Sequence, residues 1–152
     1  MGETGLPHVV SFVLDGDGRV LDGTLLHAAN ECIDVPAPPR AMFYSISCVH
    51  PSTAARALRD ERAFSDLVAR RLVGFKANAS ALSTEELVRL DHPEGDDPES
   101  FAGGMWGIHE EFGLRILGGC CGTDDRHTRA LATRWRTPAL PEKRDPDGDG
   151  RR

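Results

Sequence analysis

The sequence predicts an α/β protein built from parallel βα units. Four short apolar runs, rich in β-branched residues and each about one strand long, alternate with segments of helical spacing. Nearly continuous apolar runs are typical of strands covered on both faces, as in a parallel sheet. Because strand is followed by helix four times over, right-handed crossovers are the natural connections. A chain of 152 residues, 39% of them hydrophobic, suffices for one domain with a core and is too short for two.

The apolar runs place the predicted strands at residues 8–14, 41–48, 71–78 and 114–120. Helical patterns fill the intervals between the first three of them. A short helix is expected after Thr24, a second over residues 53–58 with Ser52 as its cap, and a third over residues 64–70.

The helices on either side of the last strand have the clearest patterns. Pro98 fits the first turn of a helix whose apolar residues recur at spacings of four and three on one face, namely Phe101, Met105, Ile108 and Phe112. Gly113 follows as its C-terminal cap. Thr123 or Asp124 is expected to cap the last helix, whose inward residues are Ala130, Leu131 and Trp135.

The connecting segments are marked by composition. Asp15–Arg19 predicts a tight turn; a calcium loop is the alternative, but the later ligands and terminal Glu of an EF-hand are missing. Residues 36–39 form a stiff proline-rich connector. We expect one folded domain over residues 1–136, followed by a disordered tail over residues 137–152, where Pro, Asp, Gly and Arg predominate.

Composition excludes several classes of function. The formal net charge of −6 argues against nucleic-acid binding, which needs a basic face. No apolar run reaches the ~18–20 residues that a membrane-spanning helix requires. The N-terminal segment has neither the basic flank nor the apolar stretch of a secretory signal, so a reducing, cytoplasmic location is expected. Disulfides are therefore a poor default for the four cysteines.

The most specific string in the chain is Gly118-Gly119-Cys120-Cys121-Gly122-Thr123, at the end of the fourth predicted strand. Neighbouring side chains of a strand point to opposite faces, so adjacent thiolates can reach one ion only where the chain turns. The glycines supply that freedom. Thiolates select soft or borderline ions such as zinc.

A further cysteine, Cys48, also ends a predicted strand. Because the carboxyl ends of parallel strands gather at one face, Cys48 is expected to lie with Cys120 and Cys121. Three cysteines would make a zinc site whose open fourth position marks a catalytic metal. Small buried hydrophobes and a redox pair are the alternatives, and Cys32 is expected to be structural. His50 and His127 are candidate fourth ligands or supporting groups, with a loop or helix-surface position as the simpler interpretation.

The order of these motifs resembles the homocysteine S-methyltransferase family. The resemblance covers roughly residues 7–135 and is carried by Val10-Ser11-Phe12 with Asp22-Gly23-Thr24, Ile46-Ser47-Cys48 with Pro51, Lys76-Ala77-Asn78-Ala79, and Ile116-Leu117 leading into the double-cysteine string with His127 after it. It implies the last four units of a (β/α)₈ TIM barrel, with Zn²⁺ bound by Cys48, Cys120 and Cys121.

The resemblance also implies an activity. Homocysteine would bind zinc through its sulfur and accept a methyl group from a sulfonium or ammonium donor, giving methionine. Asn78 is the candidate substrate-binding residue, since it could bind substrate or hold a neighbouring loop.

A complete barrel of this kind needs about 250 residues. The family's Asp-Gly-Gly segment on the first strand and the strand ending in Glu-Thr that precedes the fifth are absent from the sequence. We therefore expect an incomplete half barrel, completed by a chain supplying the N-terminal half or by a second copy. The alternative is a catalytically incomplete zinc-binding half-domain or a truncated product.

Overall fold

Four parallel strands form the single sheet of this protein in a computed structural model that describes residues 5–34, 40–60, 65–82, 86, 89, 91 and 94–136. The strands are β1 (Val10–Val13), β2 (Tyr44–Val49), β3 (Leu72–Ala77) and β4 (Ile116–Gly119). Their spatial order is β1-β2-β3-β4, and every neighbouring pair is parallel. The predicted α/β class and all four strands are confirmed, each within the expected run or one residue beyond it.

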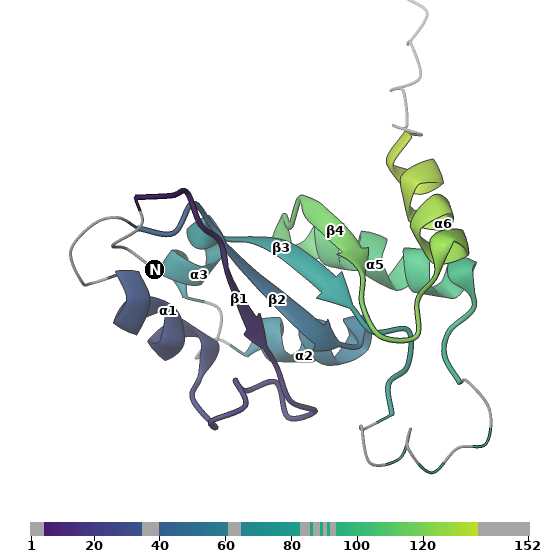
Figure 1. Cartoon of the computed structure of the whole chain (residues 1–152), viewed down its shortest axis with the longest axis horizontal. Helices are drawn as coiled ribbons and strands as arrows, with labels where there is room; N and C mark the ends of the chain where they lie inside the picture. Colours follow the sequence, from purple (N-terminus) through teal and green to yellow (C-terminus); the bar gives the residue numbers. More distant parts are fainter. Residues whose placement is uncertain are drawn as a thin grey trace, which may run out of the picture.

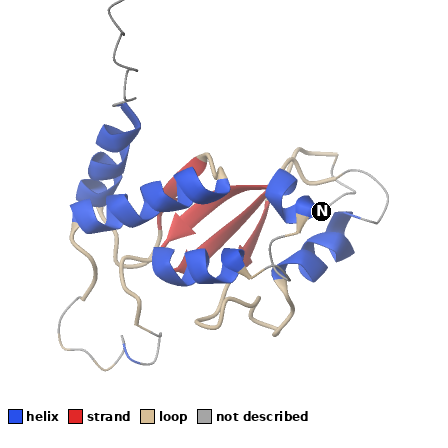
Figure 2. Cartoon of the chain, turned by 180° about the vertical axis from the view of Figure 1, so that it is seen from behind, coloured by secondary structure: helices blue, strands red, loops and turns tan. Residues whose placement is uncertain are grey.

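The helices lie on one side of this sheet. They are α1 (Leu26–Asp34), α2 (Pro51–Arg59), α3 (Asp66–Arg71), α5 (Pro98–Phe112) and α6 (Asp125–Arg136). Behind the sheet in Figure 1 and in front of it in Figure 2 lie α2, α3 and α5. At the two ends of this layer, α1 packs against α3 and α6 packs against α5. Strands in sequential order with helices on one face are consistent with part of a barrel.

The covered face of the sheet carries the core. One register row across all four strands consists of Phe12, Ile46, Phe75 and Leu117. These side chains pack with apolar residues of the helices, such as Met105 of α5, in one hydrophobic cluster. Burial of such side chains, at roughly 25 cal/mol per Å² of apolar surface, is the main force that holds the helices to the sheet.

The side chains on the opposite face of the sheet are polar or small. Its rows contain Ser11, Ser45, Ser47, Gly74 and Lys76, and the Ser11 hydroxyl donates to the Ser47 hydroxyl over 3.2 Å. No helix of the described part of the chain covers this face (Figure 1). In sequence the strand runs looked almost continuously apolar. In the structure only one face of each strand contributes to the core.

Helix α5 follows its sequence pattern closely. Asp97 is the N-cap, accepting from the Glu99 and Ser100 amides over 3.0 and 3.2 Å, and Pro98 occupies the first turn. The predicted apolar face is buried, with Phe112 partly buried at its end. Gly113 closes the helix in the left-handed conformation, with φ of 72°.

Other details of the helices correct the sequence predictions. The N-cap of α2 is the His50 side chain, which accepts from the Ser52 amide over 3.2 Å; Ser52 lies inside the helix. At the start of α6, by contrast, the prediction is confirmed, because Asp124 caps the helix by accepting from the Arg126 amide over 2.9 Å. Trp135 does not point inward: it is 46% exposed and stacks edge-on against Trp106 of α5 at 5.8 Å. Near the end of α6, Trp135 is stacked between aromatic rings of α5 and solvent and is not buried in the core.

The predicted turn at Asp15–Arg19 is confirmed. The Asp15 amide donates to the Arg19 carbonyl over 2.8 Å, and the Gly18 amide donates to the Asp15 carbonyl over 2.9 Å. The connector at 36–39, residue 64 of the predicted third helix and the tail at 137–152 lie outside the described residues. Among the helices that are described, none has the length and apolar character needed to cross a bilayer.

Candidate metal centre

Three cysteine sulfurs converge at the carboxyl end of the sheet. The Sγ atoms of Cys48, Cys120 and Cys121 all lie within 4.8 Å of one another. Cys48 belongs to β2, whereas the other two directly follow β4. The distance between the Cys48 and Cys120 sulfurs is 3.0 Å. Strand ends that are remote in sequence thus meet, as the parallel topology predicts.

A β-bulge directs Cys48 into this cluster. Ser47 pairs with Lys76 and Val49 pairs with Ala77, so β2 holds one extra residue, Cys48, at this point of the ladder. The extra residue has φ of 60°, the left-handed region, and it is the only non-glycine residue with positive φ in the described part of the chain. Bulges and strained backbone at strand ends re-aim side chains toward functional sites. Here they turn the Cys48 sulfur toward the neighbouring loop.

A tight turn presents the other two sulfurs. The Cys120 amide still donates to the Ala77 carbonyl over 2.7 Å, which continues the β3–β4 ladder by one step. The chain then turns, with Gly122 at φ of 75° and the Thr123 hydroxyl donating to the Cys120 carbonyl over 2.8 Å. A Cβ at position 119 would collide with the Thr123 side chain, so only glycine fits there.

Asn78 joins the two sulfur-bearing segments. Its side-chain amide donates to the Cys48 carbonyl over 2.9 Å, and its side-chain oxygen accepts from the Cys121 amide over 3.2 Å. Each end of one side chain therefore holds the backbone of a different ligand-bearing residue. The same residue lines the cavity next to the cysteines.

The thiols are electrostatically coupled. The hydrogen bond with Cys120, followed by burial, raises the pKa of Cys48 to about 11. Burial opposes ionisation of Cys120, but hydrogen bonds from Cys48 and Cys121 outweigh it and hold the pKa of Cys120 below its ordinary value. The ammonium of Lys76 acts in the same direction. Cys120 is thus the first sulfur of this pair to lose its proton.

The donor set fits a zinc ion. Zinc–sulfur bonds of about 2.3 Å in tetrahedral geometry place sulfurs ~3.8 Å apart. That separation lies between the 3.0 Å that separates the Cys48 and Cys120 sulfurs and the 4.8 Å within which all three sulfurs lie. Cys48 and Cys120 are partly buried and Cys121 is exposed, so one side of the cluster faces outward. Thiolates in a group of this kind prefer zinc to harder cations.

Several predicted candidates lie outside the cluster. Neither His50 nor His127 joins the sulfurs in a ligand group among the described residues. His127 is 5% exposed, so the expectation of a surface position is wrong for it. Cys32 is exposed on α1, which corrects its expected structural role, and it takes no part in the cluster. Asp96, which sequence reasoning missed, bonds to both histidines; an acidic loop before Pro98 was its only signal.

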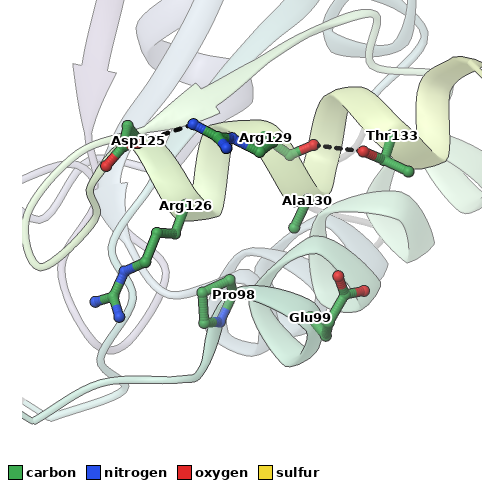
Figure 3. Close-up of a pocket in the computed structure, with 7 residues that line it drawn as sticks. All are labelled: Pro98, Glu99, Asp125, Arg126, Arg129, Ala130 and Thr133. Atoms are coloured by element: carbon green, nitrogen blue, oxygen red, sulfur yellow. Dashed lines mark hydrogen bonds and ion pairs between the residues drawn. The ribbon is translucent and has the colours of Figure 1, made fainter.

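A cavity of about 500 Å³ adjoins the sulfurs. Cys48, Asn78 and Cys121 contribute to its wall, and so do the acidic residues Asp15 and Glu86. A second hollow, of about 260 Å³, lies between α5 and α6 (Figure 3). Its charged side chains are paired, as in the contact of 3.3 Å between Arg129 and Asp125. The first cavity is therefore the one placed for chemistry at the thiols.

A parallel α/β sheet that gathers three thiols at its carboxyl edge, beside a cavity, is an arrangement that could hold a soft metal ion next to a small molecule. The family model of the homocysteine S-methyltransferases matches residues 1–135. The chain belongs to the homocysteine S-methyltransferase family. A search of curated proteins finds no match.

Proposed function

We propose that this protein is a zinc-dependent S-methyltransferase that moves a methyl group from a sulfonium or ammonium donor to homocysteine, giving methionine. The observation that carries the proposal is the convergence of Cys48, Cys120 and Cys121 within 4.8 Å at the carboxyl edge of the sheet. Family membership over residues 1–135 supports the same reaction class.

In this proposal the three cysteines hold the metal. A bound zinc ion supplies the Lewis acidity that keeps a coordinated thiol deprotonated at neutral pH. A free thiol with a pKa near ~8.5 is only a few per cent thiolate at pH 7, so the gain in nucleophile is large. The lowering of the Cys120 pKa favours ion binding, since thiolates and not thiols are ligands.

The adjoining cavity supplies the space for the substrates. Asp15 and Glu86 give its wall a negative charge, which attracts a cationic methyl donor or the ammonium group of an amino acid. Asn78 lines the same cavity, and we propose that it contacts the substrate while it holds the two loops.

A second candidate function rests on the uncovered sheet face. Four strands leave the outer edges of β1 and β4 without a neighbour among the described strands. Parallel sheets are normally covered on both faces. We propose that further strands, from another polypeptide segment or a second copy, complete a (β/α)₈ barrel over the domain of residues 1–136. Without them the protein would bind zinc but not turn over.

Metal content and methionine formation test these proposals together. We expect about one zinc per chain by mass spectrometry in the wild type and in Cys32→Ser, whose cysteine is exposed and remote, and almost none in Cys120→Ser. Methionine formation from homocysteine with S-methylmethionine, S-adenosylmethionine or betaine supports the enzyme, and zinc without turnover supports the half-domain. Thiols that alkylate equally fast with and without a chelator would contradict both and favour a redox pair.

A further inference from the structure

Asp96 is the centre of a hydrogen-bond network behind the thiol cluster. It lies in the loop between β3 and α5, and its amide donates to the Ala79 carbonyl over 2.7 Å. Its carboxylate lies 2.9 Å from Nε2 of His50. Its carbonyl accepts from Nε2 of His127 over 3.1 Å. Asp96 is therefore bonded to both histidines, to His50 through its carboxylate and to His127 through its carbonyl.

The histidines belong to the two segments that carry the sulfurs. His50 comes two residues after Cys48, where it also caps α2. His127 lies in the first turn of α6, which continues from Cys121. The Ala79 amide in turn donates to the Cys121 carbonyl over 3.0 Å. The network thus links the ends of β2, β3 and β4 without touching a sulfur atom.

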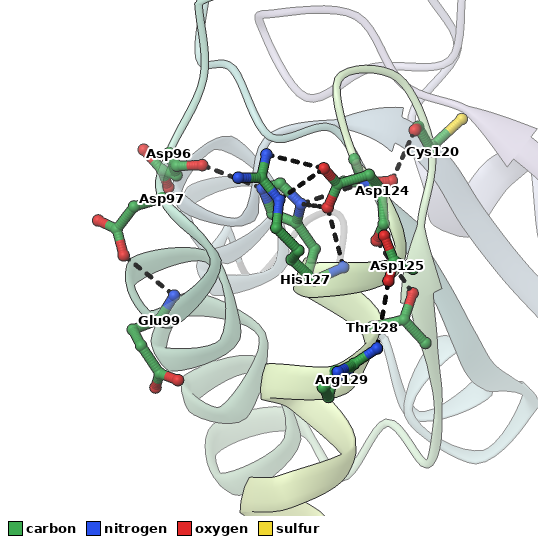
Figure 4. Close-up of polar contacts among 11 residues, drawn as sticks. Asp96, Asp97, Glu99, Cys120, Asp124, Asp125, His127, Thr128 and Arg129 are labelled. Atoms are coloured by element: carbon green, nitrogen blue, oxygen red, sulfur yellow. Dashed lines mark hydrogen bonds and ion pairs between the residues drawn. The ribbon is translucent and has the colours of Figure 1, made fainter.

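His127 is the most constrained member of the network. Its side chain is buried, and Nδ1 lies 2.8 Å from the Asp124 carboxylate while Nε2 faces the Asp96 carbonyl (Figure 4). Its ring meets the edge of Phe101 at 5.4 Å and 87°. Because both nitrogens are occupied and the ring is packed, its position is set from three sides. Removal of the ring leaves the Asp96 carbonyl without this donor, which is costly in a partly buried site.

We propose that His127, acting through Asp96, is a positioning residue that holds the loop after β4 against the loop after β2, so that the sulfurs converge before any ion binds. The expected effect on metal affinity rests on the proposed function. The role of His127 in bringing the sulfurs together does not depend on that function. A positioning residue is needed because the backbone of Cys48 is strained: its left-handed conformation persists only if the surrounding residues hold it. Residues that support metal ligands in this way typically change affinity by roughly 10–100-fold when they are lost.

The test compares three variants. His127→Leu keeps apolar bulk but removes both polar contacts, whereas His127→Gln retains a donor that can reach the Asp96 carbonyl. His109→Gln is the matched control, because His109 is also a partnered histidine, bonded at 2.8 Å to the Leu114 carbonyl at the far end of α5. We expect His127→Leu to weaken zinc binding about tenfold in chelator competition, His127→Gln to recover most of that loss, and the control to bind as the wild type does.

Two further measurements separate positioning from a purely structural role. With Co²⁺ in place of zinc, His127→Leu should shift and weaken the visible absorption bands of the thiolate site. In metal-free protein, the fluorescence that dibromobimane gains on bridging two nearby thiols should develop several-fold more slowly than in the wild type. A lowered melting temperature with unchanged zinc affinity, Co²⁺ spectrum and bridging rate would overturn the proposal.

The outcomes also keep this inference distinct from the proposed function. If the wild type binds neither zinc nor Co²⁺, the proposed function fails, while the bridging rate still tests the positioning role. If His127→Leu does not fold, Asp96→Ala replaces it, since this change removes only the carboxylate contact with His50. A several-fold loss of zinc affinity in Asp96→Ala supports the network, and wild-type affinity in Asp96→Ala contradicts it.

Discussion

The sulfur atoms of Cys48 and Cys120 lie 3.0 Å apart although the residues are 72 positions apart in the chain. This contact links the bulged end of β2 with the turn after β4. It sets which thiol ionises first, because the same hydrogen bond raises the pKa of Cys48 and lowers the pKa of Cys120. The first prediction follows from that asymmetry.

Replacement of Cys48 by Ala should make Cys120 harder to ionise. The hydrogen bond that lowers the pKa of Cys120 is lost, so its apparent pKa should rise. In metal-free protein the iodoacetamide reaction of Cys120, followed by mass spectrometry across pH, should shift to higher pH. The Cys32 reaction in the same sample is the internal control. An unchanged pH profile for Cys120 would show that the two thiols do not share a proton.

Added zinc should stabilise the protein by mass action. A ligand at 100 times its dissociation constant contributes about 2.7 kcal/mol if it binds only the folded state. We expect the melting temperature to rise by several degrees with zinc in the wild type and in Cys32→Ser, and to fall again with a chelator. Cys120→Ser should lose most of this response; a full response in that variant would exclude the cluster as the binding site.

Gly119→Ala should destabilise the turn that presents the cysteines. The new methyl group would collide with the Thr123 side chain, whose hydroxyl already holds the Cys120 carbonyl. Overpacking of this kind costs roughly 1–3 kcal/mol in the free energy of unfolding. Gly118→Ala is the matched control, because its added Cβ would meet nothing nearer than Lys76 Cγ at 4.0 Å. Equal urea midpoints for the two variants would contradict this account of the turn.

Asn78→Ala should loosen the two sulfur-bearing loops together. It removes the hydrogen bonds to the Cys48 carbonyl and from the Cys121 amide, which together are worth about 1–3 kcal/mol. Asn78→Asp keeps the acceptor for Cys121 but sets a carboxylate oxygen against the Cys48 carbonyl, so it should not restore the loss. Urea denaturation measures both variants, and full stability of Asn78→Asp would show that the bond to Cys48 contributes little.

The ion pair between Asp34 at the end of α1 and Arg71 at the end of α3 predicts that the stability of the protein falls in acid. Burial opposes ionisation of Asp34, but hydrogen bonds from Tyr44 and Arg71 hold the pKa of Asp34 below its ordinary value. The resulting stability is fully present above the unfolded pKa of about 3.9 and is lost as the pH falls through the folded pKa.

Arg71→Met should therefore lower the free energy of unfolding by roughly 2 kcal/mol at pH 7, because it removes a charged hydrogen bond to a mostly buried carboxylate. The difference in the free energy of unfolding between this variant and the wild type should shrink as the pH falls through the pKa of Asp34 in the folded protein. Arg59→Met is the control, since Arg59 and its partner Glu111 are exposed and solvent screens their attraction. A difference that stays constant between pH 7 and pH 3 would contradict this assignment.

The sequence by itself determined the strands and helices and indicated the thiol cluster. β-Branched apolar runs predicted the strands, the spacing from Phe101 to Phe112 predicted the buried face of α5, and Gly113 predicted its end. The double cysteine in its glycine frame indicated a thiol site, and the order of the motifs indicated the family that the comparison shows. These signals are local because strand propensity, helix periodicity and turn formation depend on residues close together in the chain.

Only the tertiary structure decided how those elements combine. The bulge that re-aims Cys48 arises from pairing with β3, and the bridge made by Asn78 exists only once β2 and β4 dock on either side of it. The sequence favoured a surface position for His127, whereas in the structure the side chain is enclosed by Asp96 and Phe101. Contacts between residues far apart in sequence depend on strand register and loop docking, and neither leaves a pattern in the residues nearby.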